Sequence, residues 1–122
     1  MTNNTTQGHH GTDIYCDCII PKKVDYSGNS VRVLRETDTV LAFYHTKPYW
    51  PVHIVVTPKQ HIASLLELEP GSETAKELLQ VVQEVAQTVT QSEGACRVST
   101  NLGRYQDSKH LHMHVSSGEH ES

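Results

Sequence analysis

The 122-residue sequence lacks a basic stripe, a long apolar run and an ordered set of cysteines. Its 10 lysines and arginines are outnumbered by 14 aspartates and glutamates, and the formal net charge is -4. Proteins that bind nucleic acid polymers usually carry clustered basic side chains, so no such polymer is expected as a partner. No apolar run approaches the roughly 20 residues of a membrane-spanning helix, so no membrane partner is expected either.

The cysteines are few and unevenly placed, at Cys16, Cys18 and Cys96. An odd number with a short C-x-C spacing does not make a disulfide framework. The polar N-terminal stretch "MTNNTTQGHHGTD" has no charged segment followed by an apolar one, as a secretion signal would have. Together these absences favour a reducing, cytoplasmic location.

The length fits one domain with one hydrophobic core. We expect a disordered leader over residues 1–13, a single domain over residues 14–117 and a flexible tail over residues 118–122. Within the domain, β-branched and alternating runs predict strands near residues 31–33, at 40–43 and from His53 to Pro58.

A helix and two more strands follow in the sequence. An amphipathic helix is predicted, with Ser72 as its N-cap and Gly94 as its stop, by apolar residues spaced three and four positions apart: Ala75, Leu78, Leu79, Val82, Ala86 and Val89. The stretches "CRVSTNLG" and "HLHMHV" predict the last two strands. This order predicts an α+β fold, in which one long helix packs on one face of an antiparallel sheet.

Three histidines, His110, His112 and His114, alternate with apolar residues in "HLHMHV". Side chains two positions apart share one face of a strand, so the three imidazoles are expected to lie together while the apolar residues enter the core. A neutral imidazole can attack phosphorus, and neighbouring rings can donate protons. Imidazole is also the commonest metal ligand. The spacing alone leaves open a catalytic site, a metal site and solvent-facing histidines without a joint role.

The stretch resembles the signature of the histidine triad (HIT) family, in which three histidines alternate with apolar residues. "HLHMHV" matches that signature through Val115, and Ser116 departs from it at the last apolar position. The resemblance extends over most of the chain, through "AFYH", the "TPKQH" segment, the long helix and an "N-x-G" turn. The sequence is most similar to the small single-domain branch, to which nucleoside phosphoramidases belong.

The resemblance implies a HIT-like fold and a hydrolase or transferase, which cleaves nucleoside phosphoramidates or dinucleoside polyphosphates through a covalent nucleotidyl-histidine intermediate. It implies His112 as the nucleophile, His114 and His53 as hydrogen-bond partners of the phosphate, and His110 as the residue that orients the array. It also implies a set of nucleotide-binding residues: Asn101, Gln106, Phe43, Tyr44, His45 and Ser108. An isoleucine, Ile19 or Ile20, is expected on the opposite side of the pocket. The ligand is expected to be a purine nucleotide or a nucleotide conjugate. No metal or cofactor is expected for the chemistry, and a homodimer is expected.

Two residues of the expected pocket depart from the family pattern. His45 stands where the phosphoramidase branch typically has an aspartate that grips the ribose hydroxyls, and a neutral imidazole accepts only one hydrogen bond. Asp107 stands at a serine position, where a carboxylate would repel the phosphate, and Arg104 is the candidate clamp that would compensate. These departures motivate an alternative, a nucleotide-binding regulatory module with little catalytic activity.

Many bacterial members of the family carry a structural zinc on a C-x-x-C pair and two histidines. Aligned through Cys18, the second cysteine of that pair is replaced by Pro21, and Cys16 could substitute only with a changed geometry. A structural zinc is therefore not expected.

Overall fold

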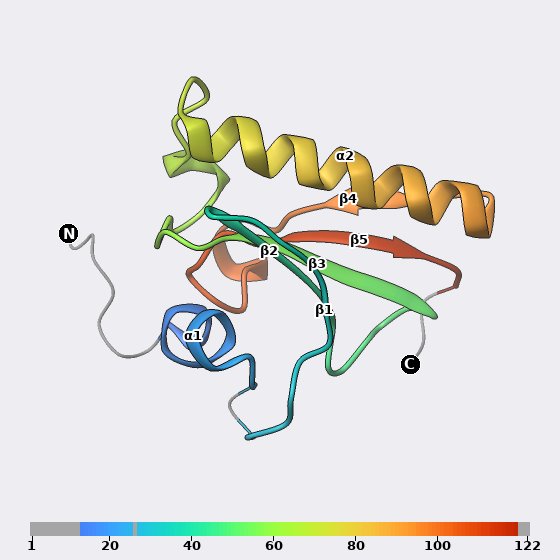
Figure 1. Ribbon diagram of the computed structural model, residues 1–122, viewed down its shortest axis with the longest axis horizontal. Helices are drawn as coiled ribbons and strands as arrows, with labels where there is room; N and C mark the ends of the chain where they lie inside the picture. The colour runs from blue at the N-terminus through green and yellow to red at the C-terminus, as the bar shows by residue number, and fades with distance from the viewer. Residues whose placement is uncertain (1–12, 26, 120–122) are drawn as a thin grey trace.

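One antiparallel sheet forms the centre of the structure, a computed structural model that describes residues 13–25 and 27–119. Its strands are β1 (Val33–Glu36), β2 (Val40–Tyr44), β3 (Val52–Pro58), β4 (Arg97–Ser99) and β5 (Met113–Ser117), in the spatial order β1-β2-β3-β5-β4. The helical elements are η1 (Tyr15–Ile19), α1 (Ile20–Lys22), η2 (Leu65–Glu67), α2 (Glu73–Glu93) and η3 (Gly103–Tyr105). Helix α2 covers one face of the sheet, and η1 and α1 lie on the opposite side (Figure 1). The predicted α+β fold is confirmed.

Strands β2 and β3 are buried on both faces because each face has its own apolar layer. In β2, Val40 and Ala42 pack toward α2. Leu41 and Phe43 pack toward η1 and α1, which together form the N-terminal helical segment. This separation follows from the two-residue period of a strand. The side chains on the second face form the floor on which Tyr15 rests.

The long helix begins and ends where the sequence predicts. The Ser72 hydroxyl accepts a hydrogen bond from the Ala75 amide at 3.1 Å, and Gly94 takes a left-handed conformation with φ 85°. One apolar residue of the predicted stripe is misplaced, because Leu79 is 59% exposed. One residue of an α-helix turns by roughly 100°, so Leu79 falls beside the face that its buried neighbour Leu78 occupies.

The N-terminal helical segment is a feature that the sequence pattern did not predict. The Asp13 carboxylate accepts hydrogen bonds from the Tyr15 amide at 2.9 Å and the Cys16 amide at 3.3 Å. Asp13, which was assigned to the leader, is itself buried. Residues 1–12 of the expected leader and residues 120–122 of the expected tail lie outside the described residues. In the part of the chain that the structure describes, no helix has the length and apolar character needed to cross a membrane.

Candidate active site

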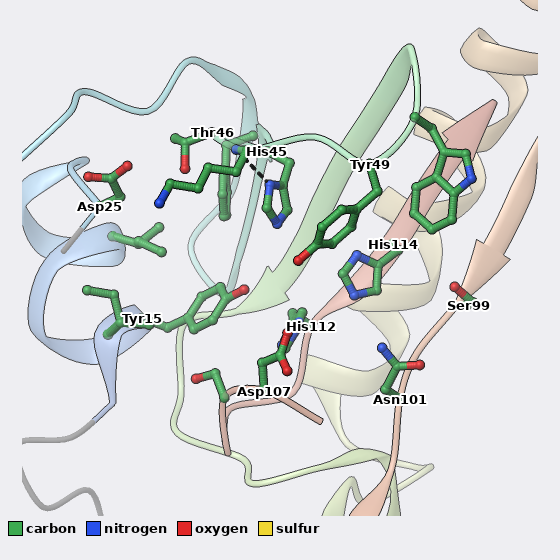
Figure 2. A pocket seen from close by; sticks show the side chains of 16 residues that line it. Tyr15, Asp25, His45, Thr46, Tyr49, Ser99, Asn101, Asp107, His112 and His114 are labelled. Carbon is green, nitrogen blue, oxygen red and sulfur yellow. Dashed lines mark hydrogen bonds between the residues drawn. The ribbon is translucent and has the colours of Figure 1, made fainter. Parts of the chain in front are cut away.

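A pocket of about 380 Å³ lies between the N-terminal helical segment, the loop after β2 and the residues that lead into β5 (Figure 2). This volume suits a small-molecule ligand. One part of its wall is apolar or aromatic: Ile14, Tyr15, Ile19, Phe43, Tyr49 and Trp50. The other part is polar and includes residues from the predicted nucleotide-binding and catalytic sets: His45, Asn101, Ser108, His112 and His114.

His112 lies in the wall of this pocket and is almost entirely buried. His112 lies immediately before β5, and its neighbours Leu111 and Val115 belong to the core beneath α2, whereas its own side chain lines the pocket. The Nδ1–H of His112 donates to the backbone carbonyl of His110 at 2.7 Å. In the neutral ring Nε2 therefore keeps its lone pair, as a nucleophile requires.

A short hydrogen-bonded relay fixes the tautomer of His114. The Tyr49 amide donates to His53 Nδ1 at 3.2 Å, so the proton of the neutral His53 ring is on Nε2. That Nε2–H donates to His114 Nδ1 at 2.8 Å. The proton of the neutral His114 ring is consequently on Nε2, where it can serve as a donor to a bound phosphate oxygen.

Burial keeps this histidine array neutral near pH 7. Burial and the neighbouring imidazoles lower the pKa of His53 to about 3, and the same two causes lower the pKa of His114 to about 4. Burial also lowers the pKa of His112, against the opposing effect of its hydrogen bond to the His110 carbonyl. A neutral His112 is the form that can attack an electrophile.

Tyr15 is a pocket residue that no feature of the sequence indicated. Its ring stacks on the His112 ring at a centroid distance of 5.1 Å and on the His110 ring at 5.0 Å. Burial raises the pKa of Tyr15, so its hydroxyl remains protonated. Tyr15 precedes the part of the sequence that resembles the HIT family, and it lies in a helical turn that the sequence did not predict, so no motif indicated it. Asp25, Thr46, Lys47 and Ser99 also line the pocket without having been predicted.

His45 presents a donor to the pocket at the position where the family pattern has an aspartate. The Lys47 amide donates to His45 Nδ1 at 2.9 Å, which places the proton of the neutral ring on Nε2. The ring stacks on His53 at a centroid distance of 4.3 Å, and burial lowers its pKa. A carboxylate would only accept hydrogen bonds here, whereas His45 Nε2–H donates one.

The two neighbouring aromatic residues of the predicted set point to opposite sides of the sheet. Phe43 lines the pocket, whereas Tyr44 packs against the core beneath α2. Successive residues of one strand cannot face the same side, so only one of them can flank the ligand. Of the two isoleucines expected across the pocket, Ile19 lines it and Ile20 does not.

Two polar residues with expected roles in the pocket lie elsewhere. The side chain of Gln106 is buried and its Nε2–H donates to the Ala63 carbonyl at 2.6 Å, so it holds the turn before β5 in place. Arg104, the candidate phosphate clamp, does not line the pocket, and its guanidinium lies 5.4 Å from the Tyr105 ring centroid.

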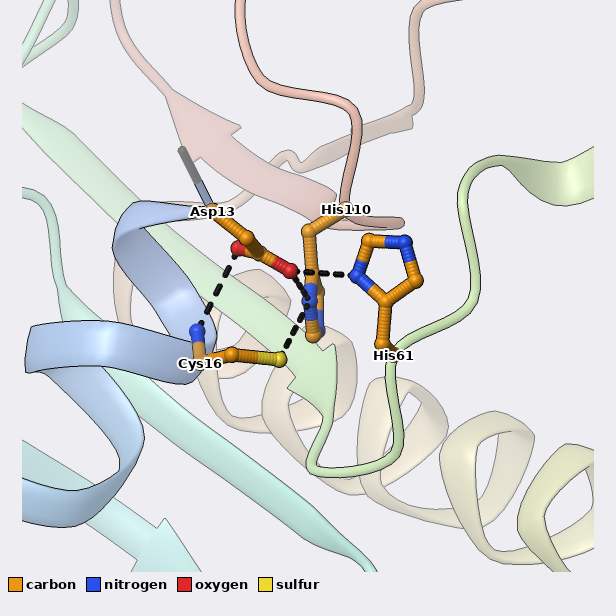
Figure 3. A group of neighbouring side chains, drawn as sticks. All are labelled: Asp13, Cys16, His61 and His110. Carbon is orange, nitrogen blue, oxygen red and sulfur yellow. Dashed lines mark hydrogen bonds and ion pairs between the residues drawn. The ribbon is translucent and has the colours of Figure 1, made fainter. Parts of the chain in front are cut away.

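The side chain of His110 belongs to a second cluster behind the pocket, beside Asp13, Cys16 and His61 (Figure 3). His110 is fully buried, and its Nε2–H donates to the Pro58 carbonyl at 2.7 Å. Its Nδ1 lies 2.7 Å from Asp13 Oδ2 and 3.7 Å from Cys16 Sγ. His110 thus orients His112 through its backbone carbonyl while its own ring serves the cluster.

The four side chains of this cluster have the composition of a metal site. Each offers one ligand atom, and these atoms all lie within 4.8 Å of one another. Two imidazoles, a thiol and a carboxylate are ligands that zinc accepts. A histidine that binds a metal through one nitrogen commonly donates its other N–H to a carbonyl, as His110 does to Pro58. The residues therefore fit a divalent transition metal.

The cluster corrects the alignment that placed Cys18 opposite the family's first zinc cysteine. Cys18 takes no part in it, and the pair three residues apart is Asp13 and Cys16. Residues three apart lie on one side of a helical turn, which brings both toward His110. Burial acts to raise the pKa of Asp13, but hydrogen bonds with His110 and His61 hold this pKa well below its usual range. Burial and Asp13 together raise the pKa of Cys16 to about 12.

Comparisons with known proteins agree with this architecture. The family model described as the HIT domain matches residues 28–121. An uncharacterized HIT-like protein of Synechococcus elongatus is 38% identical over 88 residues, which cover 70% of this chain and 77% of that protein.

Two solved structures of HIT proteins are similar over most of the chain. A HIT family hydrolase from Clostridium thermocellum has a TM-score of 0.70 and 26% identity, covering 91% of this chain and 94% of its own. A hypothetical histidine triad nucleotide-binding protein from Sulfolobus tokodaii has a TM-score of 0.70 and 26% identity, covering 85% of this chain and 67% of its own. With its alternating histidines gathered behind and beside one pocket, the chain belongs to the HIT family.

Proposed function

We propose that this protein is a nucleotide hydrolase or transferase that cleaves nucleoside phosphoramidates or dinucleoside polyphosphates through a nucleotidyl-His112 intermediate. The observation that carries the proposal is the tautomer of His112, whose Nδ1–H is held by the His110 carbonyl and whose Nε2 is left as a nucleophile in the pocket wall. The hydrolase and nucleotide-binding descriptions of the two structural relatives support the same activity.

The proposed reaction has two steps. His112 Nε2 attacks phosphorus as the bond to the leaving group breaks, and an amine leaving group takes up a proton from solvent as it departs. The His114 Nε2–H donates to a phosphate oxygen, and the His110 carbonyl stabilises the charge that develops on the His112 ring. Water then attacks phosphorus and releases a proton to solvent, the bond to His112 Nε2 breaks, and the nucleoside monophosphate leaves with His112 neutral again.

The remaining pocket residues support a purine nucleotide as ligand. Ile19, Phe43 and the ring of Tyr15 offer an apolar surface of the kind that an aromatic base contacts. Asn101 and Ser108 lie in the polar part of the pocket and supply hydrogen-bonding groups for the sugar and the phosphate.

Replacing His112 tests the proposal. The His112→Asn variant keeps a polar side chain of similar size but loses the nucleophile, so hydrolysis of AMP amidates and diadenosine polyphosphates should fall by at least roughly a thousandfold. Intact-mass spectrometry of the wild type after rapid mixing with substrate should show an added nucleotidyl group, which the variant lacks. Unchanged turnover in the variant would remove the covalent mechanism.

The alternative is a nucleotide-binding regulatory module with little catalysis. What favours it is the pair of unusual pocket residues, His45 as a donor and Asp107 as an anion near His112. Calorimetry with AMP and GMP separates the two functions, because tight binding without turnover of any amidate or dinucleotide supports the module.

We also propose that the cluster of Asp13, Cys16, His61 and His110 holds a divalent metal with a structural role. A bound ion would tie the N-terminal helical turn to the residue that orients His112. Metal analysis of untagged wild type should find about one ion per chain, and a cobalt-loaded sample should show thiolate-to-cobalt absorption that Cys16→Ser abolishes. A Cys18→Ser control should keep the absorption, because Cys18 is not in the cluster.

We further propose a homodimer that forms through the free edge of β4. Among residues 13–25 and 27–119, β4 pairs with β5 alone, and all three of its residues are exposed, with Val98 at 45%. An edge strand offers unpaired backbone groups to a second strand. Pairing of two β4 edges would join both sheets into one.

A further inference from the structure

The fixed charges of the pocket are unusual for a site that would receive a phosphate. Among the described residues that line it, two are acidic, Asp25 and Asp107, and one is permanently cationic, Lys47. The imidazoles add no positive charge near pH 7, because the pKa values of His45, His112 and His114 are lowered. Arg104 does not line the pocket.

The two carboxylates differ in what they contact. Asp25 is buried, and its Oδ1 accepts hydrogen bonds from the Ser27 and Asn29 amides, each at 2.9 Å, so it stabilises its own loop. Asp107 is exposed, and in the described part of the chain its carboxylate has neither a hydrogen bond nor an ion pair. The charge of Asp107 is therefore available to a ligand.

Asp107 is held close to the reacting centre. It follows Gln106, whose buried amide is anchored on the Ala63 carbonyl, and its side chain lies beside His112 in the pocket (Figure 2). Its negative charge raises the pKa values of His112 and His114, against the larger lowering caused by burial. An anionic phosphorus centre bound at His112 Nε2 would thus lie within the field of the Asp107 carboxylate.

We propose that Asp107 selects substrates whose leaving group carries a positive charge, namely phosphoramidates of amines that bear a second, ammonium group. Such a group placed beside Asp107 offsets the repulsion between carboxylate and phosphate. A dinucleoside polyphosphate brings further negative charge to the same place and is disfavoured. This inference rests on the proposed function and narrows its substrate class.

A matched pair of substrates tests the inference. The AMP amidates of pentylamine and of cadaverine share one reacting bond and one chain length, and differ in a terminal ammonium group. For the wild type, kcat/KM should be roughly tenfold or more higher for the cadaverine amidate. Asp107→Asn should reduce this ratio to near one, and rising salt should reduce it in the wild type. No divalent cation is added to the assays, so that no free cation screens the carboxylate.

A control variant distinguishes the effect of the Asp107 charge in the pocket from the effect of a changed net charge of the protein. Asp38 is an exposed carboxylate in the turn between β1 and β2 and does not line the pocket. Asp38→Asn should keep the wild-type ratio. A wild-type ratio near one, or an equal ratio in the wild type and Asp107→Asn, would overturn the inference.

A binding measurement keeps the inference independent of turnover. If the wild type hydrolyses neither amidate, the proposed function fails. The inference is then decided by the dissociation constants of the two amidates, which should still differ by roughly tenfold in the wild type and converge in Asp107→Asn. Equal affinities in the wild type, or no binding of either amidate, would overturn it.

Discussion

The proton on each imidazole of the pocket is placed by the hydrogen-bond partner of Nδ1. His112 and His114 end with opposite arrangements, because one ring donates through Nδ1 to a carbonyl and the other accepts at Nδ1 from His53. The same residue type therefore supplies a nucleophile and a hydrogen-bond donor two positions apart. The roles follow from backbone and side-chain neighbours rather than from the histidines themselves.

The pH dependence of activity follows from the lowered pKa of His112. A solvent-exposed imidazole has a pKa of 6.5, and burial moves the pKa of His112 below that value. We expect the decline of hydrolysis in acid, where His112 becomes protonated, to have its midpoint below pH 6.5. Because the Asp107 carboxylate raises the pKa of His112, Asp107→Asn should move the decline to still lower pH. A pH profile of kcat/KM with a neutral amidate checks this, and a midpoint of the decline at or above pH 6.5 would contradict it.

Stability should also fall in acid because of the buried histidines. The pKa of His53 moves from 6.5 to about 3 on folding, so below pH 6.5 the unfolded chain binds a proton that the folded chain does not. The free energy of unfolding is therefore retained above pH 6.5, and it decreases progressively as the pH falls toward the pKa of His53 in the folded protein, about 3. Thermal melting over this range should show a smaller acid-induced decrease in Tm for His53→Gln than for the wild type. Equal decreases in Tm for the wild type and His53→Gln would contradict the conclusion that His53 contributes to the loss of stability in acid.

The sequence could indicate the candidate catalytic residues but not every neighbour. The alternation in "HLHMHV" indicated His112 and His114, and both line the pocket. It could not show that the ring of His110 turns to Asp13, since that contact joins positions 97 residues apart. Tyr15 was missed for the same reason, because its stacking on His112 depends on how two distant segments pack.

At the scale of elements, the ends of α2 depend on two identifiable residues. Removing the Ser72 hydroxyl leaves the Ala75 amide without its partner, so Ser72→Ala should lower the free energy of unfolding by about 1 kcal/mol. Urea unfolding measures the change. Ser92→Ala near the other end of the helix is the control. In the described part of the chain the Ser92 hydroxyl hydrogen-bonds to the Glu93 side chain and caps no backbone amide, so its loss should matter little. Equal effects of the two variants would contradict the cap.

The helix and the strands were easier to predict than the N-terminal segment. Helix α2 carries its own signals, an amphipathic repeat with a cap at each end. The segment from Tyr15 to Lys22 is short, contains Pro21 and is anchored by the contacts of Asp13 and by the packing of Tyr15 and Ile19 on the sheet. Short elements whose stability comes from tertiary contacts leave little local pattern to read.

At the scale of the whole molecule, the order of the strands gives the protein two different edges. β5 lies between β3 and β4, so the histidine-bearing strand is central, while β1 and β4 remain at the edges. Local patterns predicted the strands but not this order, which is set by packing across the sheet. It places the pocket on one face, away from α2, and leaves the β4 edge available for assembly.

The proposed homodimer predicts a change of mass when this edge is altered. Val98→Lys adds a charge at the centre of β4, where two copies of the chain would bring like charges together. We expect sedimentation equilibrium to give a dimer for the wild type and a monomer for the variant. Val33→Lys on β1, the opposite edge, is the control, because Val33 is similarly exposed, at 39% against 45% for Val98, and should leave the dimer intact. A monomeric wild type would remove the homodimer, and a dimeric Val98→Lys would move the interface away from β4.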